Sequence, residues 1–249
     1  MYGRAVGGSG AVGLVWQVPA EVRRGFSQRF AEDSRALRTT ASTTAHLCGN
    51  LPNNDLVALS RIIPHTKLTP IFNPWHHVSH GANLPQSVQA IIEIPKGSKG
   101  KYELDKDSGL LKLDRVLFSA VHYPAAYGFI PQTYCDDHDP LDILVLCSVD
   151  IPHMCVVEAK VIGVMQMLDQ DEEDDKIIAV AAHDASVNHF NELEDLPPHT
   201  MLEMQRFFED YKALENKHVT VKQFLGRQDA YRIIEESVKL YQQSFRGGK

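Results

Sequence analysis

From residue 87 onward the chain consists of short apolar runs, many of them β-branched, that glycine, aspartate and proline interrupt. The runs cover residues 88–94, 101–104, 110–117, 143–146, 156–165 and 177–182. Each has the length and composition of a β-strand, and turns such as Lys106-Asp107-Ser108-Gly109 favour antiparallel pairing over crossover helices. We therefore expect a mainly β fold whose sheet closes as a barrel.

Two later segments have helical spacing instead, and both follow the strands. One stripe holds Met201, Met204, Phe208, Tyr211 and Leu214, and a second holds Ile233, Ser237, Leu240 and Tyr241. Apolar residues three to four positions apart form one face of a helix. Pro197-Pro198 precedes the first stripe, where proline is common at a helix start. The sequence thus predicts two C-terminal helices packed on the sheet.

The N-terminal fifth of the chain has a different composition. The first twenty residues contain no acid, and residues 1–50 are rich in arginine and hydroxyl side chains, which is typical of organelle transit peptides. Arg24-Gly25-Phe26-Ser27 resembles a mitochondrial processing site. We expect residues 1–50 to be a transit peptide, for a mitochondrion rather than a plastid, residues 51–87 a connector, and residues 88–249 the main folded domain. The alternative is an untargeted extension on a cytoplasmic protein.

Charge and hydropathy exclude two classes of partner. Lys and Arg number 25 against 32 Asp and Glu, so the net charge is −7, whereas a general nucleic-acid surface shows a basic balance. The apolar runs are far shorter than the roughly 18 residues that a membrane span needs. We expect no nucleic-acid and no membrane partner.

The most specific motif is Asp137-His138-Asp139-Pro140-Leu141-Asp142, directly before the apolar run 143–146. Desolvating even one carboxylate is costly, so three in six residues require a positive partner. Hard oxygen ligands suit Mg²⁺ or Mn²⁺. Taken alone, the motif is equally compatible with a solvated acidic turn.

A second acidic loop runs from Asp169 to Asp175 and ends at Lys176, again directly before an apolar run. A lone acidic run is usually solvated, but two such loops on one sheet can share metals through Asp137, Asp142, Asp169 and Asp174. Basic and phenolic residues accompany them. Lys101 lies on the same strand face as Glu103, and Arg115 and Lys212 lie at a strand end and a helix turn. Tyr123 and Tyr127 lie near the carboxylate motif, in a segment where Gly128 predicts a loop leading to Asp137. Surface ion pairs and core tyrosines are the plainer interpretations.

Two glycine- or histidine-bearing segments are less informative. Residues 96–101 (Lys-Gly-Ser-Lys-Gly-Lys) fail the GxxxxGK[ST] spacing of a nucleotide loop, so we expect a hairpin turn there. Trp75 is followed by His76 and His77, with His80 nearby. These histidines lack a further ligand cluster, so we expect Trp75 to dock the connector onto the domain rather than border a metal site.

Together these motifs resemble the soluble family I inorganic pyrophosphatases of the plant-like and protist-like type, from about Asn73 to Gln242. The D-x-D-P-x-D run of residues 137–142 is the specific match. The wider pattern also agrees at Ile92-Glu93-Ile94-Pro95, Lys101-Tyr102-Glu103, Asp114-Arg115, Tyr123-Pro124, Tyr127-Gly128, Asp169, Asp174, Lys176 and Phe207 to Lys212. Asn73 and His77 depart from the His and Asp that flank Pro-Trp-His in plant relatives.

The resemblance implies an OB-like five-stranded antiparallel barrel with packed C-terminal helices, and an enzyme that hydrolyses diphosphate to two orthophosphates with Mg²⁺. It implies metal ligands at Asp137, Asp142, Asp174, Asp169 and Glu93. It implies a water-activating base at Asp139, a proton donor at Tyr123, and support of the cluster by Glu103. Phosphate would be held by Lys101, Arg115, Tyr127, Lys176, Tyr211 and Lys212.

Further expectations concern cofactors and partners. Mn²⁺ should substitute for Mg²⁺, whereas the larger, flexibly coordinated Ca²⁺ should inhibit. A homo-oligomer is left open. The competing hypothesis is a non-catalytic divalent-cation-binding module, which explains the acids but gives the lysines and Arg115 no role.

Overall fold

The computed structural model describes residues 72–246, so the expected transit peptide (1–50) and most of the connector lie outside the described residues. The elements, in order, are α3 (Pro74–His77), β1 (Ser87–Ile94), β2 (Gly100–Leu104), β3 (Leu111–Val116), β4 (Ala126–Phe129), β5 (Asp142–Leu146), β6 (Val156–Asp169), β7 (Glu172–Glu173), β8 (Lys176–Ala181), η1 (Leu193–Asp195), α4 (Pro198–Asp210), η2 (Ala213–Glu215), β9 (Val219–Gly226), α5 (Arg227–Tyr241) and the π-helical turn η3 (Gln242–Arg246). The described part is mainly β with few helices, as expected. None of its helices has the length and hydropathy needed to cross a membrane.

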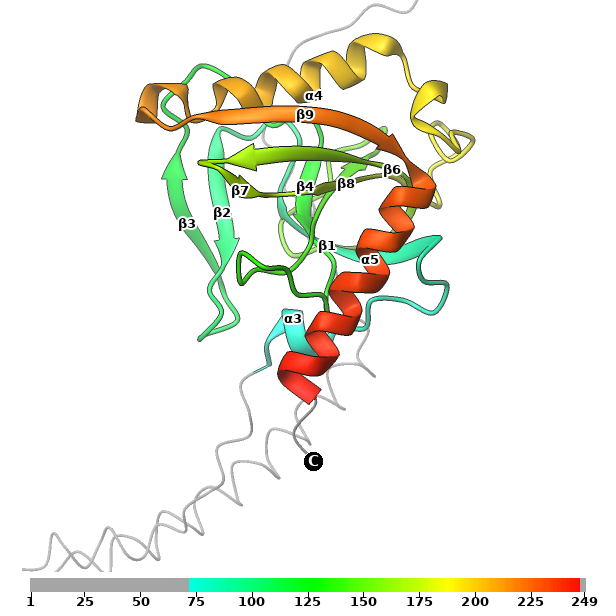
Figure 1. The fold of residues 1–249 in the computed structure, drawn as a ribbon. Helices are drawn as coiled ribbons and strands as arrows, with labels where there is room; N and C mark the ends of the chain where they lie inside the picture. Colours follow the sequence, from blue (N-terminus) through cyan, green and yellow to red (C-terminus); the bar gives the residue numbers. More distant parts are fainter. Residues whose placement is uncertain (1–71, 247–249) are drawn as a thin grey trace, which may run out of the picture. The chain divides into compact units, whose positions relative to one another are not determined.

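Five strands form a closed ring. The order is β1, β4, β5, β8 and β6, and β6 pairs with β1 to complete the circle. The 14-residue β6 is the longest strand, and it also pairs with β7 and β9 (Figure 1). β2 and β3 form a separate two-stranded sheet at one side.

The expectation of an entirely antiparallel ring was wrong at one pair. β5 and β8 run parallel, from Asp142 opposite Lys176 to Leu146 opposite Val180. A parallel pair needs a crossover connection, and here β6 and β7 supply it in place of a helix. The two strands therefore begin at the same edge of the ring.

The β2–β3 hairpin confirms the turn predicted at residues 106–109. The hairpin expected at residues 96–101 was wrong. That segment connects β1 to β2, and these strands belong to different sheets because β1 is already paired on both edges, with β4 and with β6.

Alternation along the strands divides the core into two buried clusters. Leu144 and Ile178 belong to a cluster with Met204 and Phe208 of α4, whereas their neighbours Ile143 and Ile177 belong to a cluster with Ile234 of α5. Successive side chains of a strand point to opposite faces, so both faces of the ring are covered. Figure 1 shows α4 and α5 on different sides of the ring strands.

The helix stripes were correct in part. α4 ends at Asp210, and Tyr211 is its C-cap residue. Leu214, which was predicted to lie on the buried stripe, lies beyond the helix in η2 and is 65% exposed. β4 and β9 were missed. β9 carries an alternation of buried Val219 and Val221 with exposed Thr220 and Lys222 that could have revealed it.

β4 was missed because Gly128 suggested a loop. Gly128 instead lies in β4 opposite Ile92, and a Cβ there would overlap the carbonyl oxygen of Ile91. The glycine permits the close approach of β1 to β4 that keeps Tyr127 at the edge of the ring.

We expect Gly128→Ala to destabilise the fold by about 1–3 kcal/mol or more, because the added methyl group must displace the backbone of β1. Thermal unfolding followed by circular dichroism measures this. Gly226→Ala is the control, since nothing lies within 4 Å of a Cβ built there. Equal midpoints for the two variants would contradict the interpretation of Gly128.

Candidate active site

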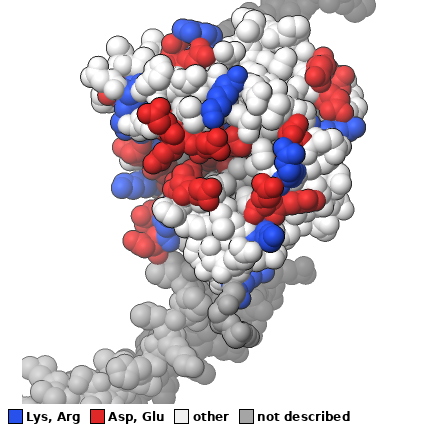
Figure 2. Space-filling model, viewed as in Figure 1, with Lys and Arg blue, Asp and Glu red and all other residues white. Residues whose placement is uncertain are grey.

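One cavity of about 360 Å³ lies where the ring edge, the β2–β3 hairpin and the end of α4 meet. Every residue predicted for the site lines it except Arg115 and Tyr123. Residues not predicted for the site also line it, and they are Trp75, Tyr102, Leu104, Lys106, Pro140, Gln170, Glu172 and Glu173. Figure 2 shows acidic side chains gathered on one face of the domain, with basic side chains between them.

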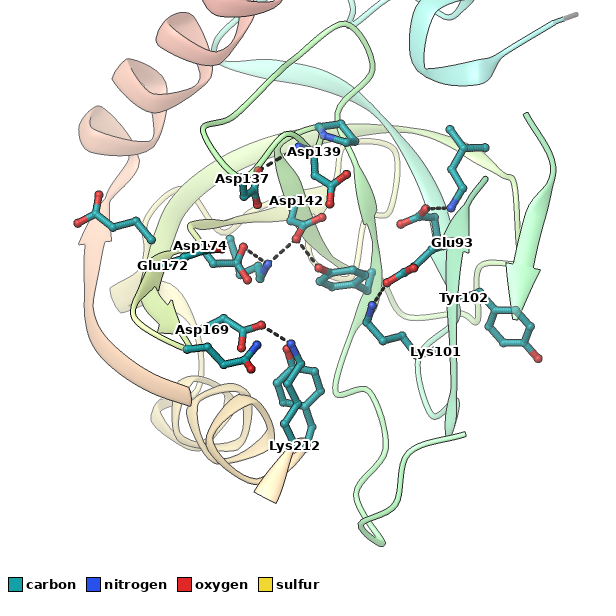
Figure 3. Close-up of a pocket in the computed structure, with 18 of the residues that line it drawn as sticks. Glu93, Lys101, Tyr102, Asp137, Asp139, Asp142, Asp169, Glu172, Asp174 and Lys212 are labelled. Atoms are coloured by element: carbon teal, nitrogen blue, oxygen red, sulfur yellow. Dashed lines mark hydrogen bonds and ion pairs between the residues drawn. The ribbon is translucent and has the colours of Figure 1, made fainter. Parts of the chain in front are cut away.

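The parallel pair brings the two acidic loops together. Asp142 is the first residue of β5 and Lys176 the first of β8, and they are partners in the ladder. The loop that carries Asp137 and Asp139 enters β5, and the loop that carries Asp174 enters β8, so both loops end at the same edge. In Figure 3, Asp137, Asp139 and Asp142 lie together, and Asp169 and Lys212 lie on another side of the cavity.

Lys176 supplies the buried positive charge at this edge of the ring. Its side chain is 3% exposed, and its ammonium contacts the carboxylates of Asp142 and Asp174. Burial alone would lower the pKa of Lys176, but the two carboxylates raise it well above its ordinary value. The hydroxyl of Tyr127 donates to Asp142, and the Tyr127 ring lies 5.7 Å from the ammonium.

Burial also shifts two carboxyl groups. It raises the pKa of Asp142 to about 6, against the opposing charge of Lys176. Burial and the neighbouring Asp142 raise the pKa of Glu93 to about 8, although Glu93 accepts a 2.6 Å hydrogen bond from the backbone N–H of Leu104. Such groups ionise more readily when a cation approaches them.

The opposite wall repeats the pairing of an acid with a lysine. Lys212 contacts Asp169 through Oδ2, while the other oxygen, Oδ1, is buried without a hydrogen-bond partner. Lys101 contacts Glu103 and lies 3.6 Å from Asp114, so these residues form the ion pairs of the plainer interpretation, and Lys101 and Glu103 also line the cavity.

Arg115 lies behind this wall and is held by two acids. Its Nε donates to Glu215 at 2.8 Å and its Nη1 contacts Asp114, while Nη2 is buried without a partner. Glu215, in η2, was not predicted. It is 100 positions from Arg115, and no spacing pattern connects them.

Tyr123 does not reach the cavity. It is 2% exposed, and its ring packs against Tyr127 and Phe207 at 5.4 and 4.6 Å between centroids. Burial raises the pKa of its hydroxyl far above the ordinary value. The structure thus places the Tyr123 ring in the core beside Tyr127, outside the set of residues that line the cavity.

The carboxylate oxygens of the site are ligands of the type that a hard divalent cation prefers, but several of them contact lysines. Within residues 72–246, no three His, Cys, Asp or Glu side chains converge closely enough to hold a metal ion. The predicted ligands Asp142, Asp174 and Asp169 contact lysines instead. The unpartnered Oδ1 of Asp169 and Nη2 of Arg115 offer one acceptor for a cation and one donor for an anion.

The chain matches known proteins over this same region. Residues 90–242 match the family model described as inorganic pyrophosphatase. Soluble inorganic pyrophosphatase 2 of Chlamydomonas reinhardtii is 51% identical over 173 residues, which cover 70% of this chain and 90% of the relative. A soluble inorganic pyrophosphatase of Oryza sativa is 51% identical over 169 residues, covering 68% and 79%.

A solved structure shares the fold. The crystal structure of inorganic pyrophosphatase from Thermus thermophilus superposes with a TM-score of 0.65 at 38% identity, covering 70% of this chain and 99% of that one. The family model spans more than half of the chain, and the sequence relatives agree with the structural one. The chain belongs to the inorganic pyrophosphatase family.

Proposed function

We propose that this protein hydrolyses inorganic diphosphate to two orthophosphates with the help of Mg²⁺. The observation that carries the proposal is the convergence of two acidic loops and several lysines on one cavity. Diphosphate is densely anionic, so an acidic cavity binds it only together with cations. The family to which the chain belongs supports the same activity.

The metal-facing residues in this proposal are carboxylates on three strands, β1, β5 and β6, and on the loops that enter β5 and β8: Glu93, Asp142, Asp169, Asp137 and Asp174. When bound, Mg²⁺ supplies an acidified water and neutralises phosphate charge. Mn²⁺ offers similar chemistry with the same oxygen donors.

The other residues act on water and phosphate. Asp139, whose side chain is 53% exposed at the cavity rim, takes a proton from the attacking water. Glu103 keeps Lys101 in place. The phosphates are held by Lys101, Lys176, Lys212, Tyr127 and Tyr211, which line the cavity. Arg115 lies behind the cavity wall, and we assign its buried, unpartnered Nη2 to phosphate as well. Arginine and lysine suit this task because they remain charged at neutral pH.

Tyr123 enters this scheme differently from its expected role as a proton donor. Its buried ring supports Tyr127, whose hydroxyl holds Asp142. We assign Tyr123 to that packing role.

We also infer that the ring is an OB-like barrel. Its closure between β1 and β6 leaves no free edge in the five-strand circle, and the site lies at one end of it. A homo-oligomer stays a prediction.

The first prediction is magnesium-dependent release of orthophosphate from diphosphate by the purified protein. Replacing Mg²⁺ by Ca²⁺ should abolish the release, because Ca²⁺ takes flexible, larger coordination shells. A colorimetric phosphate assay measures both. Retention of Mg²⁺ without phosphate release would support the non-catalytic cation-binding module instead.

Two substitutions should separate proton transfer from metal binding. Asp139→Asn should lower kcat by about 10²-fold or more, in line with a lost general base, with a small change in the Mg²⁺ concentration needed for half activity. Asp142→Asn should raise that Mg²⁺ concentration, because Asp142 lies at the buried end of the acidic cluster. Steady-state kinetics over a range of Mg²⁺ measures both effects.

Asp136→Asn is the matched control, since Asp136 lies in the same loop but does not line the cavity. Equal shifts of the Mg²⁺ requirement in Asp139→Asn and Asp142→Asn would contradict the assignment of separate roles.

We further propose that residues 1–50 direct the protein to an organelle, with a mitochondrion favoured over a plastid, that residues 51–87 connect them to the domain, and that residues 88–249 form the catalytic domain. The composition of the first fifty residues supports this. Removing diphosphate inside the organelle would draw forward the biosynthetic reactions that release it.

A chain that starts at Leu51 should hydrolyse diphosphate as fast as the full chain, because every proposed site residue follows it. A C-terminal fluorescent fusion of the full chain should enter the organelle, and the fusion without residues 1–50 should stay cytosolic. Microscopy and the phosphate assay measure these results. Diffuse cytosolic fluorescence from both fusions would reject targeting.

A further inference from the structure

The short helix α3 and its Trp75 lie before the region that matches the family model, yet Trp75 borders the cavity. We propose that α3, although it lies within the connector residues 51–87, acts as part of the catalytic unit, and that Trp75 is a positioning residue, which acts on Asp139 through Thr133 and through Lys106. The proposal rests on the function proposed above.

The first connection runs from Trp75 to the acidic loop. The indole N–H of Trp75 donates to the carbonyl oxygen of Thr133 at 2.8 Å, and Trp75 is 3% exposed. Thr133 is fully buried, and its hydroxyl accepts from the backbone N–H of Leu141 at 2.8 Å and donates to Ile130 at 2.6 Å. Trp75 therefore holds the residue that ties together both ends of the loop bearing Asp137 and Asp139.

The second connection runs through the β2–β3 hairpin. The ammonium of Lys106 lies 5.7 Å from the Trp75 ring, contacts the carboxylate of Asp139, and donates to the carbonyl oxygen of His138 at 3.1 Å. The side-chain amide of Asn73 donates to the backbone oxygen of Lys106 at 2.7 Å. The same ring that supports the acidic loop thus supports the lysine that faces Asp139.

The position of α3 is fixed from two further sides. His76 shares a 2.8 Å hydrogen bond with the hydroxyl of Tyr241 in α5, and the Trp75 ring packs against Phe245. Gly109 approaches from the hairpin, where a Cβ would lie 2.5 Å from the carbonyl oxygen of Phe72. α3 consequently contacts α5, the hairpin and the acidic loop at the same time.

A purely structural role for α3 predicts a different result from a positioning role. The ion pairs of the phosphate-holding side chains Arg115, Lys176 and Lys212 are made with acids outside α3. Loss of positioning should therefore lower kcat and leave the KM for diphosphate nearly unchanged, whereas general destabilisation should not separate the two constants.

The test uses substitutions in the full chain. Trp75→Leu should lower kcat by roughly tenfold to a hundredfold, the cost of misplacing a catalytic group by about 1 Å, with KM for diphosphate changed by less than about twofold. Trp75→Phe keeps the ring beneath Lys106 but loses the N–H, so its kcat should fall less. Lys106→Met should lower kcat in the same way.

Lys112→Met is the matched control, because Lys112 is an exposed lysine on the same hairpin. Leu193→Ala, in the core beside Gly163, controls for lost stability. Wild-type kcat in folded Trp75→Leu, or the same kinetics in Trp75→Leu and Leu193→Ala at equal thermal midpoints, would overturn the proposal. If Trp75→Leu does not fold, wild-type kcat in Lys106→Met and Trp75→Phe would overturn it.

A spectroscopic measurement is independent of turnover. The chain has two tryptophans, so Trp16→Phe leaves Trp75 as the single one. Its fluorescence should change on addition of Mg²⁺, because a cation near Asp139 competes with Lys106, and the change should be smaller with Lys106→Met. Unchanged emission would overturn the connection between Trp75 and the site. A wild-type protein that shows the emission change but releases no phosphate would instead reject the proposed function.

Discussion

The parallel pairing of β5 with β8 is the arrangement on which the site depends. Parallel strands present their first residues at one edge, so Asp142 and Lys176 become neighbours and the two acidic loops meet. Had the pair been antiparallel, the loops would lie at opposite ends of the strands. The long β6, paired with β1, β8 and β9, keeps this edge in place, and the rest of the cavity is added around it.

Much of this arrangement could be predicted from the sequence because the governing signals are local. Strand runs, the 106–109 turn and the acidic loops are contiguous, and the family resemblance grouped the charged residues that line the cavity. The expectation of a loop at Gly128 was wrong because the role of this glycine depends on β1, which is distant in sequence. The parallel pair was missed because local turns do not reveal a crossover made by another strand.

The residues that the sequence did not reveal are those defined by contact alone. Glu215 meets Arg115 across 100 positions. Trp75 was expected to dock the connector, but its partner Thr133, 58 positions away, was not predicted. Tyr123 shows the opposite case. The motif singled out this residue, but it did not reveal that its side chain is buried and does not line the cavity. Burial of a side chain depends on which elements cover it, and here Phe207 of α4 does so.

The pairing of carboxylates with lysines has a thermodynamic consequence. A divalent cation that binds Asp142, Asp174 or Asp169 must compete with Lys176 or Lys212, and an anion that binds those lysines must compete with the carboxylates. Each ligand therefore frees the partner that the other requires. By linkage, the cation and the phosphate anion must each strengthen the affinity of the other by the same factor. The site is then selective for the two arriving together, and it discriminates against either ion on its own.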